Sequence, residues 1–494
     1  MAKIDSVADV NIDIEPESQS EPARERSSSG PFRIAVLGDF SGRSHRKAVP
    51  PEAPRAIEID PENFEEVMER MGVELSLSAG DIQLAMRFRE LDDFHPDNIY
   101  RSLPLFHVFN EARKELARQP APRAPEPITP PTPAPEPIRA PEPPAGSLLD
   151  LIAAQSPAPS RSPSSAREPA RPSVNDEGAW DQAIRSIVSR HAIPKADPHQ
   201  SDRIAELDRS AASAMRAILT HPDFQALEAA WRSIFLLFNQ LDTGVDLKIY
   251  LIDVSKHELA DSAVRKLLVD DAIGTPGEAP WSVIAGLYTF APSESDCRIL
   301  AKLASIARAA GAPFVAAIDP RLFGCKSIAE TPDPDDWKHP DAEELRNWQA
   351  LRGSPDARWL GLAMPRFLLR VPYGAKTSPI DSFDFEEMPN PPRHEFYLWA
   401  NPAIACVCLM GAAFNRDGWD LRPGSINRLH SVAVHSWAPG EVTPQAEIWM
   451  TERFAGRMLD WGVMPLASVK HSDQVQLVRF QSIADPPAPL AGPW

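Results

Sequence analysis

The chain has 494 residues, 43% of them hydrophobic, and a formal net charge of −18 at pH 7. This length allows roughly two to four domains with ordinary apolar cores, while the acidic balance argues against nonspecific nucleic-acid binding, which needs a concentrated basic face. The 4 cysteines include no CxxC pair, so we expect reduced thiols and neither a disulfide framework nor a zinc knuckle.

The N-terminal segment, residues 1–30, is acidic and has neither the basic nor the apolar region of a secretory signal. The longest apolar stretch, residues 402–414, is too short and too rich in alanine to span a bilayer. These features favour a cytoplasmic location, and we expect the first 30 residues to be disordered.

Residues 31–117 have the pattern of a small domain of mixed α+β type. A strand is predicted over residues 32–37, and a tight turn with two glycines follows at residues 38–42. A helix begins after Asp60, which can cap it, and two alternating runs then predict a hairpin with one buried face. The two hairpin runs and a final helix are expected at residues 73–77, 82–88 and 96–116.

The next segment, residues 118–173, is dominated by proline, alanine and serine. Residues 120–144 hold 12 prolines and no aromatic residue. Proline fixes φ and removes a backbone donor, so this run predicts a disordered, extended linker of about 3 Å per residue. The linker divides the chain into two folded parts, and residues 146–155 form a short apolar island within it.

Residues 174–484 have the pattern of a larger α/β domain, followed by a proline-rich tail at residues 485–494. Apolar strands alternate with helices, and this order implies a mostly parallel sheet that is covered on both faces. Leading helices are expected at residues 180–192 and 204–219, with an amphipathic run from residue 222. The alternating strands and helices are expected at residues 247–254, 256–268, 281–287, 293–310 and 313–318. Later elements are expected at residues 359–364, 432–435, 446–461 and 475–483.

Sequence motifs typical of catalysis are missing. The chain has no Walker loop, no GxGxxG turn after a strand, no HExxH pair and no GxSxG elbow, and its 12 histidines are scattered. The acidic run at residues 333–344 can bind a hard cation only if its carboxylates converge, and we interpret it as a solvated loop. Cys406 and Cys408 are expected in the core. We therefore predict no catalytic, cofactor or metal site, and no enzyme.

Two groups of motifs carry a family resemblance. In the first unit they are PFRIAVLGDFSG at residues 31–42, IEID at 57–60 with Asn63-Phe64, and FRELDDFHPD at 88–97. In the second unit they are HPDFQALE at 221–228, APFVAA at 312–317, LAMPRFLLRVPY at 362–373 and WANPA at 399–403. The first unit resembles the small sheath subunit (TssB or VipA) of the bacterial type VI secretion system, and the second resembles the large sheath subunit (TssC or VipB).

This resemblance implies a natural fusion of the two subunits of a contractile, phage-tail-like sheath. The implied function is structural, and the implied partners are other sheath subunits, the inner-tube protein, the baseplate and a ClpV-like AAA+ unfoldase. Because both units resemble subunits that bind each other, we expect the two halves to associate through a sizeable apolar interface. The fusion raises the local concentration of each half for the other.

The apolar island at residues 146–155 resembles the N-terminal helix of the large subunit that the unfoldase recognises. On a helix, Leu148, Leu149 and Ile152 lie on one face, which suits docking into a groove. The alternative is an incidental apolar segment of a linker. These three side chains are the only partner-binding site predicted from the sequence.

The resemblance implies that both units end before the C-terminal strands and helices of the family, and that these losses remove edge strands that would join protomers. We therefore expect the isolated chain to form small species rather than long tubules, and a separate partner to supply the strands. The alternative function is an accessory or terminal subunit that docks on the sheath or baseplate without polymerising. A remote alternative is an enzyme on the same scaffold.

Overall fold

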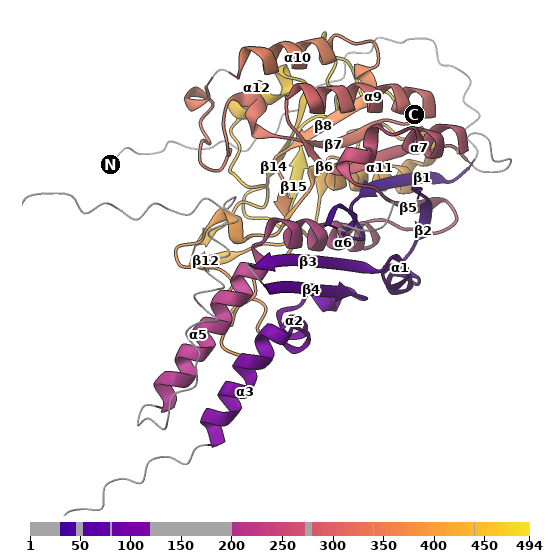
Figure 1. Cartoon of the computed structure of the whole chain (residues 1–494). Coiled ribbons are helices and arrows are strands. Elements are labelled where there is room, and N and C mark those ends of the chain that lie inside the picture. The colour runs from indigo at the N-terminus through magenta and orange to yellow at the C-terminus, as the bar shows by residue number, and fades with distance from the viewer. Residues whose placement is uncertain are drawn as a thin grey trace, which may run out of the picture.

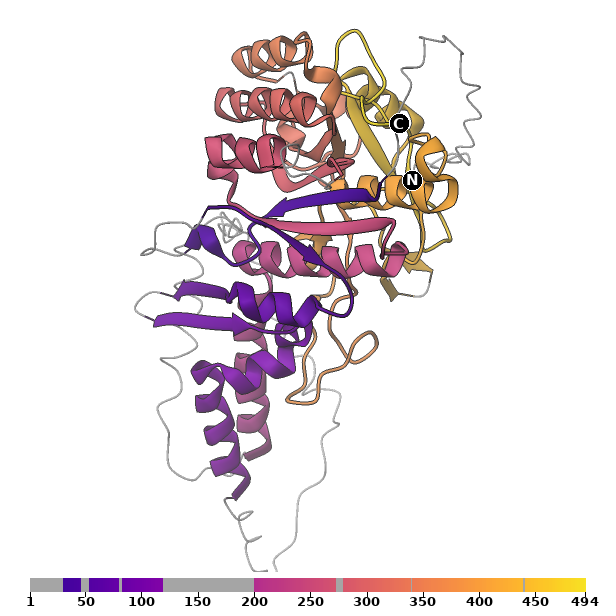
Figure 2. The same cartoon turned by 90° about the vertical axis from the view of Figure 1, so that its right-hand side faces the viewer.

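The computed structural model describes residues 30–45, 53–79, 82–118, 200–271, 279–338, 340–438 and 440–494. They form a layered α/β body from which two long helices project as an arm (Figures 1 and 2). The predicted α/β class is confirmed, because helices cover a large and mostly parallel sheet. The predicted linker run at residues 120–144 and the predicted helix at 180–192 lie outside the described residues.

The body is built on one nine-stranded sheet with the order β11-β15-β14-β8-β7-β6-β1-β5-β2. The five pairings from β5 through β1, β6, β7 and β8 to β14 are parallel, and the pairings at both ends are antiparallel. The strands are β1 (Phe32–Gly38), β2 (Ala56–Ile59), β5 (Leu247–Asp253), β6 (Val283–Phe290), β7 (Phe314–Ile318), β8 (Leu360–Met364), β11 (Arg428–Leu429), β14 (Val463–Ser468) and β15 (Val475–Leu477).

Strand β1 comes from the first sequence unit and lies between β5 and β6 of the second. All seven of its residues are buried. Phe32, Ile34 and Val36 enter the core on one face of the sheet, and Ala35 and Leu37 enter the core on the other face. A strand buried on both faces has a nearly continuous apolar sequence, and FRIAVL is apolar except for the buried Arg33. The residues on the two sides of the linker therefore share one sheet.

Helices cover both faces of this sheet (Figure 1). On one face, α11 (Pro402–Asp417) packs on β6 and β7, and α6 (Pro222–Gln240) packs on α11. Twelve of the sixteen residues of α11 are buried, including both of its cysteines, because the helix is covered on all sides. The other face carries α7 (Ser262–Arg265), α9 (Glu294–Ala310), α10 (Ala342–Arg352) and α12 (Glu452–Asp460).

The first unit adds a further layer beyond α6 (Figure 2). It contains the predicted hairpin, whose strands β3 (Val73–Ala79) and β4 (Ile82–Phe88) pair in antiparallel register, with Val73, Leu75 and Leu77 buried. The helices of this layer and of the arm are α1 (Phe64–Met71), α2 (Pro96–Ser102), α3 (Pro104–Arg118) and α5 (Gln200–Leu219).

The helix predicted over residues 96–116 is two helices. Leu103 between them is extended, with φ −83° and ψ 129°. The following residue, Pro104, has no backbone N–H and disfavours helical geometry in the residue before it, so α2 ends there. Helix α3 then leaves the body and α5 returns to it, side by side (Figures 1 and 2).

Three other sequence predictions need correction. The segment 432–435 is not a strand, because its pairing begins only at β12 (Ser436–Ala438), which pairs with β13 (Glu441–Val442). The helix predicted over 446–461 starts at Glu452, where Thr451 caps it. The helix predicted over 256–268 is a 3-10 turn (Lys256–Ala260), a single α-helical turn, and a π-helical turn (Lys266–Asp271).

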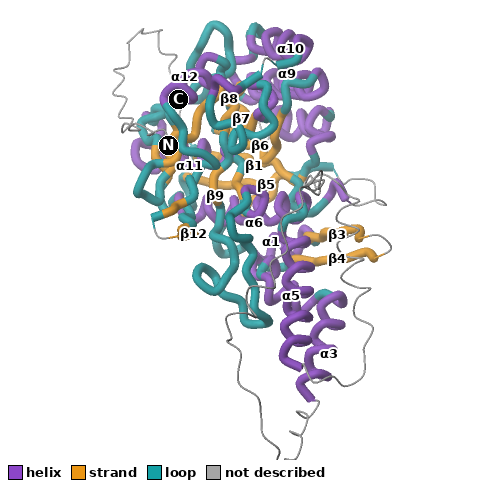
Figure 3. The backbone as a smooth tube through the Cα atoms, turned by 90° about the vertical axis from the view of Figure 1, so that its left-hand side faces the viewer, coloured by secondary structure: helices purple, strands orange, loops and turns teal. Residues whose placement is uncertain are grey.

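A second two-stranded sheet, β9 (Phe367–Leu368) with β10 (Trp399–Ala400), lies beside the main sheet (Figure 3). The irregular residues 371–392 between these two strands are called the strap below. Within the described ranges, no helix is both long and apolar enough to cross a bilayer.

Candidate functional site

One group of polar contacts between the first and second units lies at the carboxyl ends of β1 and β5. The carboxylate of Asp253, the last residue of β5, accepts hydrogen bonds from the backbone N–H groups of Phe40 and Ser41 at 2.9 and 3.1 Å. It also accepts a hydrogen bond from the Ser41 hydroxyl at 2.7 Å. Burial raises the pKa of Asp253 despite these donors. The turn at residues 38–42, interpreted as structural from the sequence, is thus fixed to the neighbouring strand.

An ion pair lies next to this turn. The Arg43 guanidinium donates to both carboxylate oxygens of Glu258, at 2.8 to 3.1 Å. Glu258 also accepts hydrogen bonds from the backbone N–H and the hydroxyl of Ser255. Burial opposes ionisation, but the hydrogen bonds from Arg43 and Ser255 hold the pKa of Glu258 below its ordinary value. A bidentate pair of this kind sets the orientation as well as the distance of the two loops.

Aromatic residues of the first unit surround Trp231 of α6. Phe40 and Phe64 approach the Trp231 ring edge-on, with centroids 5.5 and 5.6 Å away. The indole Nε1–H of Trp231 donates to the Phe40 carbonyl at 2.8 Å. Both Phe40 and Trp231 are fully buried. A buried tryptophan needs a partner for its N–H, and here that partner is the backbone of the other unit.

A second group of contacts joins the strap to α2 and to the arm. The Asp97 carboxylate accepts hydrogen bonds from the backbone N–H groups of Asp381 and Ser382, at 2.9 to 3.1 Å. The Arg113 guanidinium donates to the Ser382 carbonyl. From α5, Arg216 donates to the Glu386 carbonyl at 2.8 Å. The strap therefore holds helices from both units at the base of the arm.

A buried charge cluster fixes the other side of the strap. Arg370 donates to the carboxylates of Glu228 and Glu387, with shortest distances of 2.8 Å to each. Arg232 adds a contact to Glu228 at 2.7 Å, and the guanidinium of Arg370 lies over the Tyr373 ring at 4.2 Å. Burial opposes ionisation of Glu228, but Arg370 and Arg232 hold its pKa below the ordinary value.

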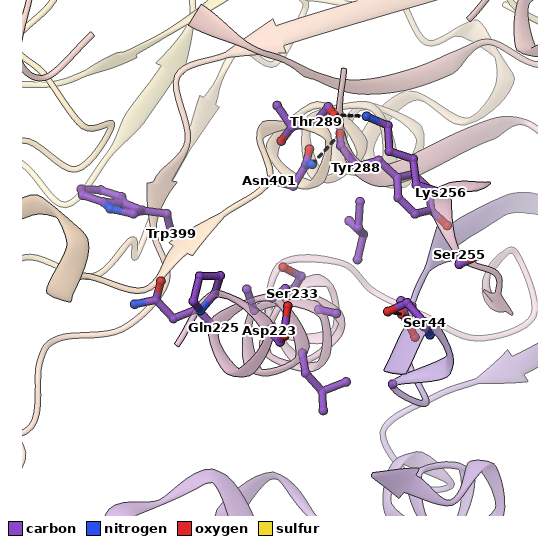
Figure 4. Close-up of a pocket in the computed structure, with 18 of the residues that line it drawn as sticks. Ser44, Asp223, Gln225, Ser233, Ser255, Lys256, Tyr288, Thr289, Trp399 and Asn401 are labelled. Atoms are coloured by element: carbon purple, nitrogen blue, oxygen red, sulfur yellow. Dashed lines mark hydrogen bonds between the residues drawn. The ribbon is translucent and has the colours of Figure 1, made fainter. Parts of the chain in front are cut away.

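A cavity of about 450 Å³ lies beside these contacts and is lined by both units (Figure 4). Asp39 and Ser44 line it from the first unit, and the start of α6 lines it from the second. Lys256 donates to the Thr289 carbonyl and to the Asp296 carboxylate, both at 2.8 Å. Asn401 donates to the Tyr288 carbonyl at 3.1 Å. Lys256 and Asn401 thus form hydrogen bonds within the protein, and these bonds hold together the elements that form the wall of the cavity.

The polar groups of the site described above bind the two units to each other. Across the described part of the chain, no group of three or more His, Cys, Asp or Glu side chains could hold a metal ion. The acidic run at residues 333–344 serves as helix caps, since Asp333 accepts from the Asp335 N–H and Asp341 accepts from the N–H groups of Glu343 and Glu344. Two carboxylates of the run, those of Asp333 and Asp341, are thus used in capping, and Asp335 pairs with Arg453.

The predicted partner-binding residues Leu148, Leu149 and Ile152 lie outside the described residues. The charge cluster of Glu228, Arg370 and Glu387 was missed by the sequence analysis. A signal existed, because a glutamate on the inward face of an amphipathic helix must be paired. Glu228 lies one position after Leu227, on the buried side of α6. One partner of Glu228, Arg232, lies four residues along the same helix, but Arg370 is 142 residues further along the chain.

Both units match known families. Residues 8–121 match the type VI secretion system VipA family, and residues 201–484 match the tail sheath N-terminal domain of VipB (EvpB) proteins. The chain is also similar to the type VI secretion system sheath protein TssC1 of Pseudomonas aeruginosa strain PAO1. The two are 32% identical over 335 residues, which cover 62% of this chain and 67% of that protein. The resemblance predicted for each unit is therefore confirmed.

Proposed function

The chain belongs to the sheath-protein family of the type VI secretion system, and we propose that its VipA-type and VipB-type units pair within one polypeptide to form one sheath protomer. It is a structural component of the contractile sheath. The accessory, non-polymerising alternative is not favoured, because the matches cover both units.

One observation supports pairing within the chain above all others. Strand β1 of the VipA-type unit fills the position between β5 and β6 of the VipB-type unit, in parallel register with both. Without β1, two central strands lose their ladder partners and expose both apolar faces at the gap. Burial of Phe32, Ile34, Val36 and Leu37 contributes about 1.5–3 kcal/mol for each side chain. The second unit therefore depends on the first for a complete sheet.

The other roles implied by the family are proposed in the same way. The sheath protomer contacts an inner tube and a baseplate, works in the cytoplasm and has no enzymatic activity. The island at residues 146–155 presents Leu148, Leu149 and Ile152 to a ClpV-like AAA+ unfoldase. These proposals rest on the resemblance of the sequence to sheath subunits.

A cleavable chain tests the pairing. A site for a specific protease is inserted within residues 120–144, and the full chain is purified and cut. We expect the two fragments to co-elute on size exclusion and to separate only in denaturant, because they share a sheet and a core. Fragments that elute separately in native buffer contradict the proposal.

A second measurement distinguishes pairing within one chain from exchange between two chains. If β1 pairs in cis, each unassembled particle has the mass of one 54.4 kDa chain, before and after cutting. An exchanged dimer has twice that mass, and mixed chains with two different tags then purify together. Substitution of Leu149 by Asp in the same chain serves as a matched control, since it lies outside both units and leaves co-elution unchanged.

A further inference from the structure

The cavity between the two units lies at the carboxyl ends of three neighbouring parallel strands. Strand β1 pairs with β5 on one side and with β6 on the other, so the chain crosses β1 when it passes from β5 to β6. Asp39 lines the cavity just after β1, residues 255–257 line it just after β5, and residues 287–289 line it at the end of β6. In open α/β sheets, ligands bind in the crevice at such a change of direction.

Small side chains on α6 give the cavity its depth. The residues of α6 that share this face follow a spacing of three and four residues, and they are Ala226, Ala229, Ala230 and Ser233. Exposure falls along the face, because Ala226 is exposed, Ala230 is 6% exposed and Ser233 is 1% exposed. The cavity therefore opens near the start of α6 and is closed at Ser233.

The Ser233 hydroxyl has no partner within the protein. It belongs to the cavity wall, and no described residue forms a hydrogen bond with it. The Thr220 hydroxyl, by contrast, donates to the Arg216 carbonyl four residues earlier, at 2.8 Å. Figure 4 shows Ser233 on the side of α6 that faces Tyr288 and Asn401 across the cavity. A buried polar group is costly without a partner, so this hydroxyl indicates a ligand with a polar atom at this depth.

Two cationic side chains of the lining have donors to spare. The Lys256 ammonium has three N–H groups, and the Thr289 carbonyl and the Asp296 carboxylate accept two of them. The Arg366 guanidinium donates to Glu447 through Nε and Nη2. The Lys256 and Arg366 side chains are 31% and 46% exposed. Both cations therefore keep N–H groups for a further acceptor in the open part of the cavity.

The acidic residues of the lining are already engaged. The Asp39 carboxylate accepts hydrogen bonds from the N–H groups of Arg43 and Ser44, at 2.6 and 3.0 Å, and from the Ser44 hydroxyl. Asp223 lies beside His221, with 3.7 Å between Oδ2 and Nδ1. The start of α6 adds the partial positive charge of a helix N-terminus. The balance of charge in the cavity thus favours an anion over a cation.

We propose that this cavity binds a small organic anion with an apolar body. Its volume of about 450 Å³ is in the range of small-molecule sites. The apolar body lies against the small side chains of α6, the anionic group meets Lys256 and Arg366, and a polar atom reaches the Ser233 hydroxyl. The proposal goes beyond pairing of the two units but depends on it, because Asp39 and Leu75 of the first unit form part of the wall.

A ligand in this position stabilises the pairing of the units. Only the paired form has the complete wall, so a ligand that binds this form alone shifts the equilibrium toward it by mass action. At a ligand concentration of 100 Kd the shift is about 100-fold. The chain thereby couples the concentration of the anion to the stability of the protomer.

Two dyes that differ by one sulfonate group test the class of ligand. Anilinonaphthalene sulfonate and its neutral parent, phenylnaphthylamine, are titrated into the full chain, with fluorescence and calorimetry as readouts. We expect one saturable site per chain for the sulfonate and at least tenfold weaker binding of the neutral dye. Equal affinities of the two dyes, or no saturable site, overturn the proposal.

Matched variants test the position of the site. Ala226→Trp blocks the opening and is expected to abolish the saturable site, whereas Ala205→Trp, at an exposed position of α5 outside the lining, leaves it unchanged. Ser233→Ala is expected to weaken sulfonate binding by about two- to tenfold, the value of one hydrogen bond. Lys256→Gln is expected to weaken binding of the sulfonate more than that of the neutral dye. Unchanged sulfonate binding in Ala226→Trp or in Ser233→Ala overturns the proposal.

Cleavage within residues 120–144 separates this proposal from the pairing of the units. Co-elution of the cut fragments without dye reports pairing, so fragments that co-elute but bind no dye contradict the ligand site alone. Fragments that elute separately contradict the pairing itself. We also expect the sulfonate to raise the urea concentration at which the cut fragments separate. A midpoint that does not move at saturating dye overturns the proposal.

Discussion

Replacement of Arg370 by methionine removes the one charged side chain among the described residues that contacts both Glu228 and Glu387. Arg370→Met keeps much of the length and apolar volume of the side chain. Glu228 is 0% exposed and Glu387 is 1% exposed, so neither carboxylate can regain water without local unfolding. Breaking a buried pair by removal of one partner typically costs about 3–5 kcal/mol, and we expect a loss in that range.

The dependence of this loss on pH follows from the charges. In the native chain the pKa of Glu228 is lowered, so its contribution to stability is present above the unfolded pKa and is lost as the pH falls. In Arg370→Met, burial opposes ionisation of Glu228 with only Arg232 left to offset it, so the pKa of Glu228 is higher than in the native chain. The variant therefore loses stability relative to the wild type as the pH rises. We expect a larger deficit near pH 7 than near pH 5.

Urea denaturation of the wild-type chain and the variant at both pH values measures this difference. The control is Arg370→Met combined with Glu228→Gln and Glu387→Gln, which has no buried charge to leave unpaired and should recover part of the loss. A deficit below about 1 kcal/mol, or one that does not change with pH, refutes the reasoning, because it means that water reaches the carboxylates.

Two further predictions concern the contacts of Glu447 with Arg366 and His394, and the packing of Gly286 in the centre of the sheet. Burial opposes ionisation of Glu447, yet Arg366 and His394 lower its pKa from 4.5 to about 2. Ionised Glu447 therefore contributes about 3 kcal/mol to the free energy of unfolding above pH 4.5, and this contribution is lost as the pH falls toward 2. Glu447→Gln is therefore expected to lower the melting temperature near pH 7 and to flatten its fall in acid; a variant with the same acid profile as the wild type contradicts this. Gly286→Ala places a Cβ 2.5 Å from Phe314 Cζ and is expected to lower the free energy of unfolding in urea by about 1–3 kcal/mol. The control is Gly244→Ala, whose Cβ meets nothing within 4 Å. Equal effects of the two substitutions contradict the packing argument.

Local sequence patterns predicted helices and strands more successfully than they predicted which strands pair with each other. The apolar run of β1 and the alternation of β3 and β4 are properties of a few consecutive residues, and both were predicted. The pairing of Ile34 with Val283 joins residues 249 positions apart, and no local periodicity encodes it. For the same reason β1 was assigned to a separate small domain, whereas the structure places it in the centre of the large sheet.

The missed parts of the site have the same cause. Residues 432–435 alternate like a strand, but a strand exists only where a partner ladder exists, and that ladder begins at Ser436. Arg370 precedes the irregular strap and Glu387 lies within it, so the meeting of both with Glu228 depends on tertiary structure. By contrast, the caps His95 and His221 follow from their positions before Pro96 and Pro222, at sites where short-range geometry decides the contact.

The arm has a topological consequence. Helix α3 ends at Arg118 and α5 begins at Gln200, and because one helix leaves the body and the other returns, both of these ends lie at the far end of the arm (Figure 2). The 81 residues between these two ends connect a pair of antiparallel helices that a loop of 2–5 residues joins in an ordinary αα-hairpin. Loop-closure entropy grows only with the logarithm of length, so halving this stretch changes stability by about 0.6 kcal/mol. We therefore expect insertions or deletions in this stretch to leave the pairing of the two units intact.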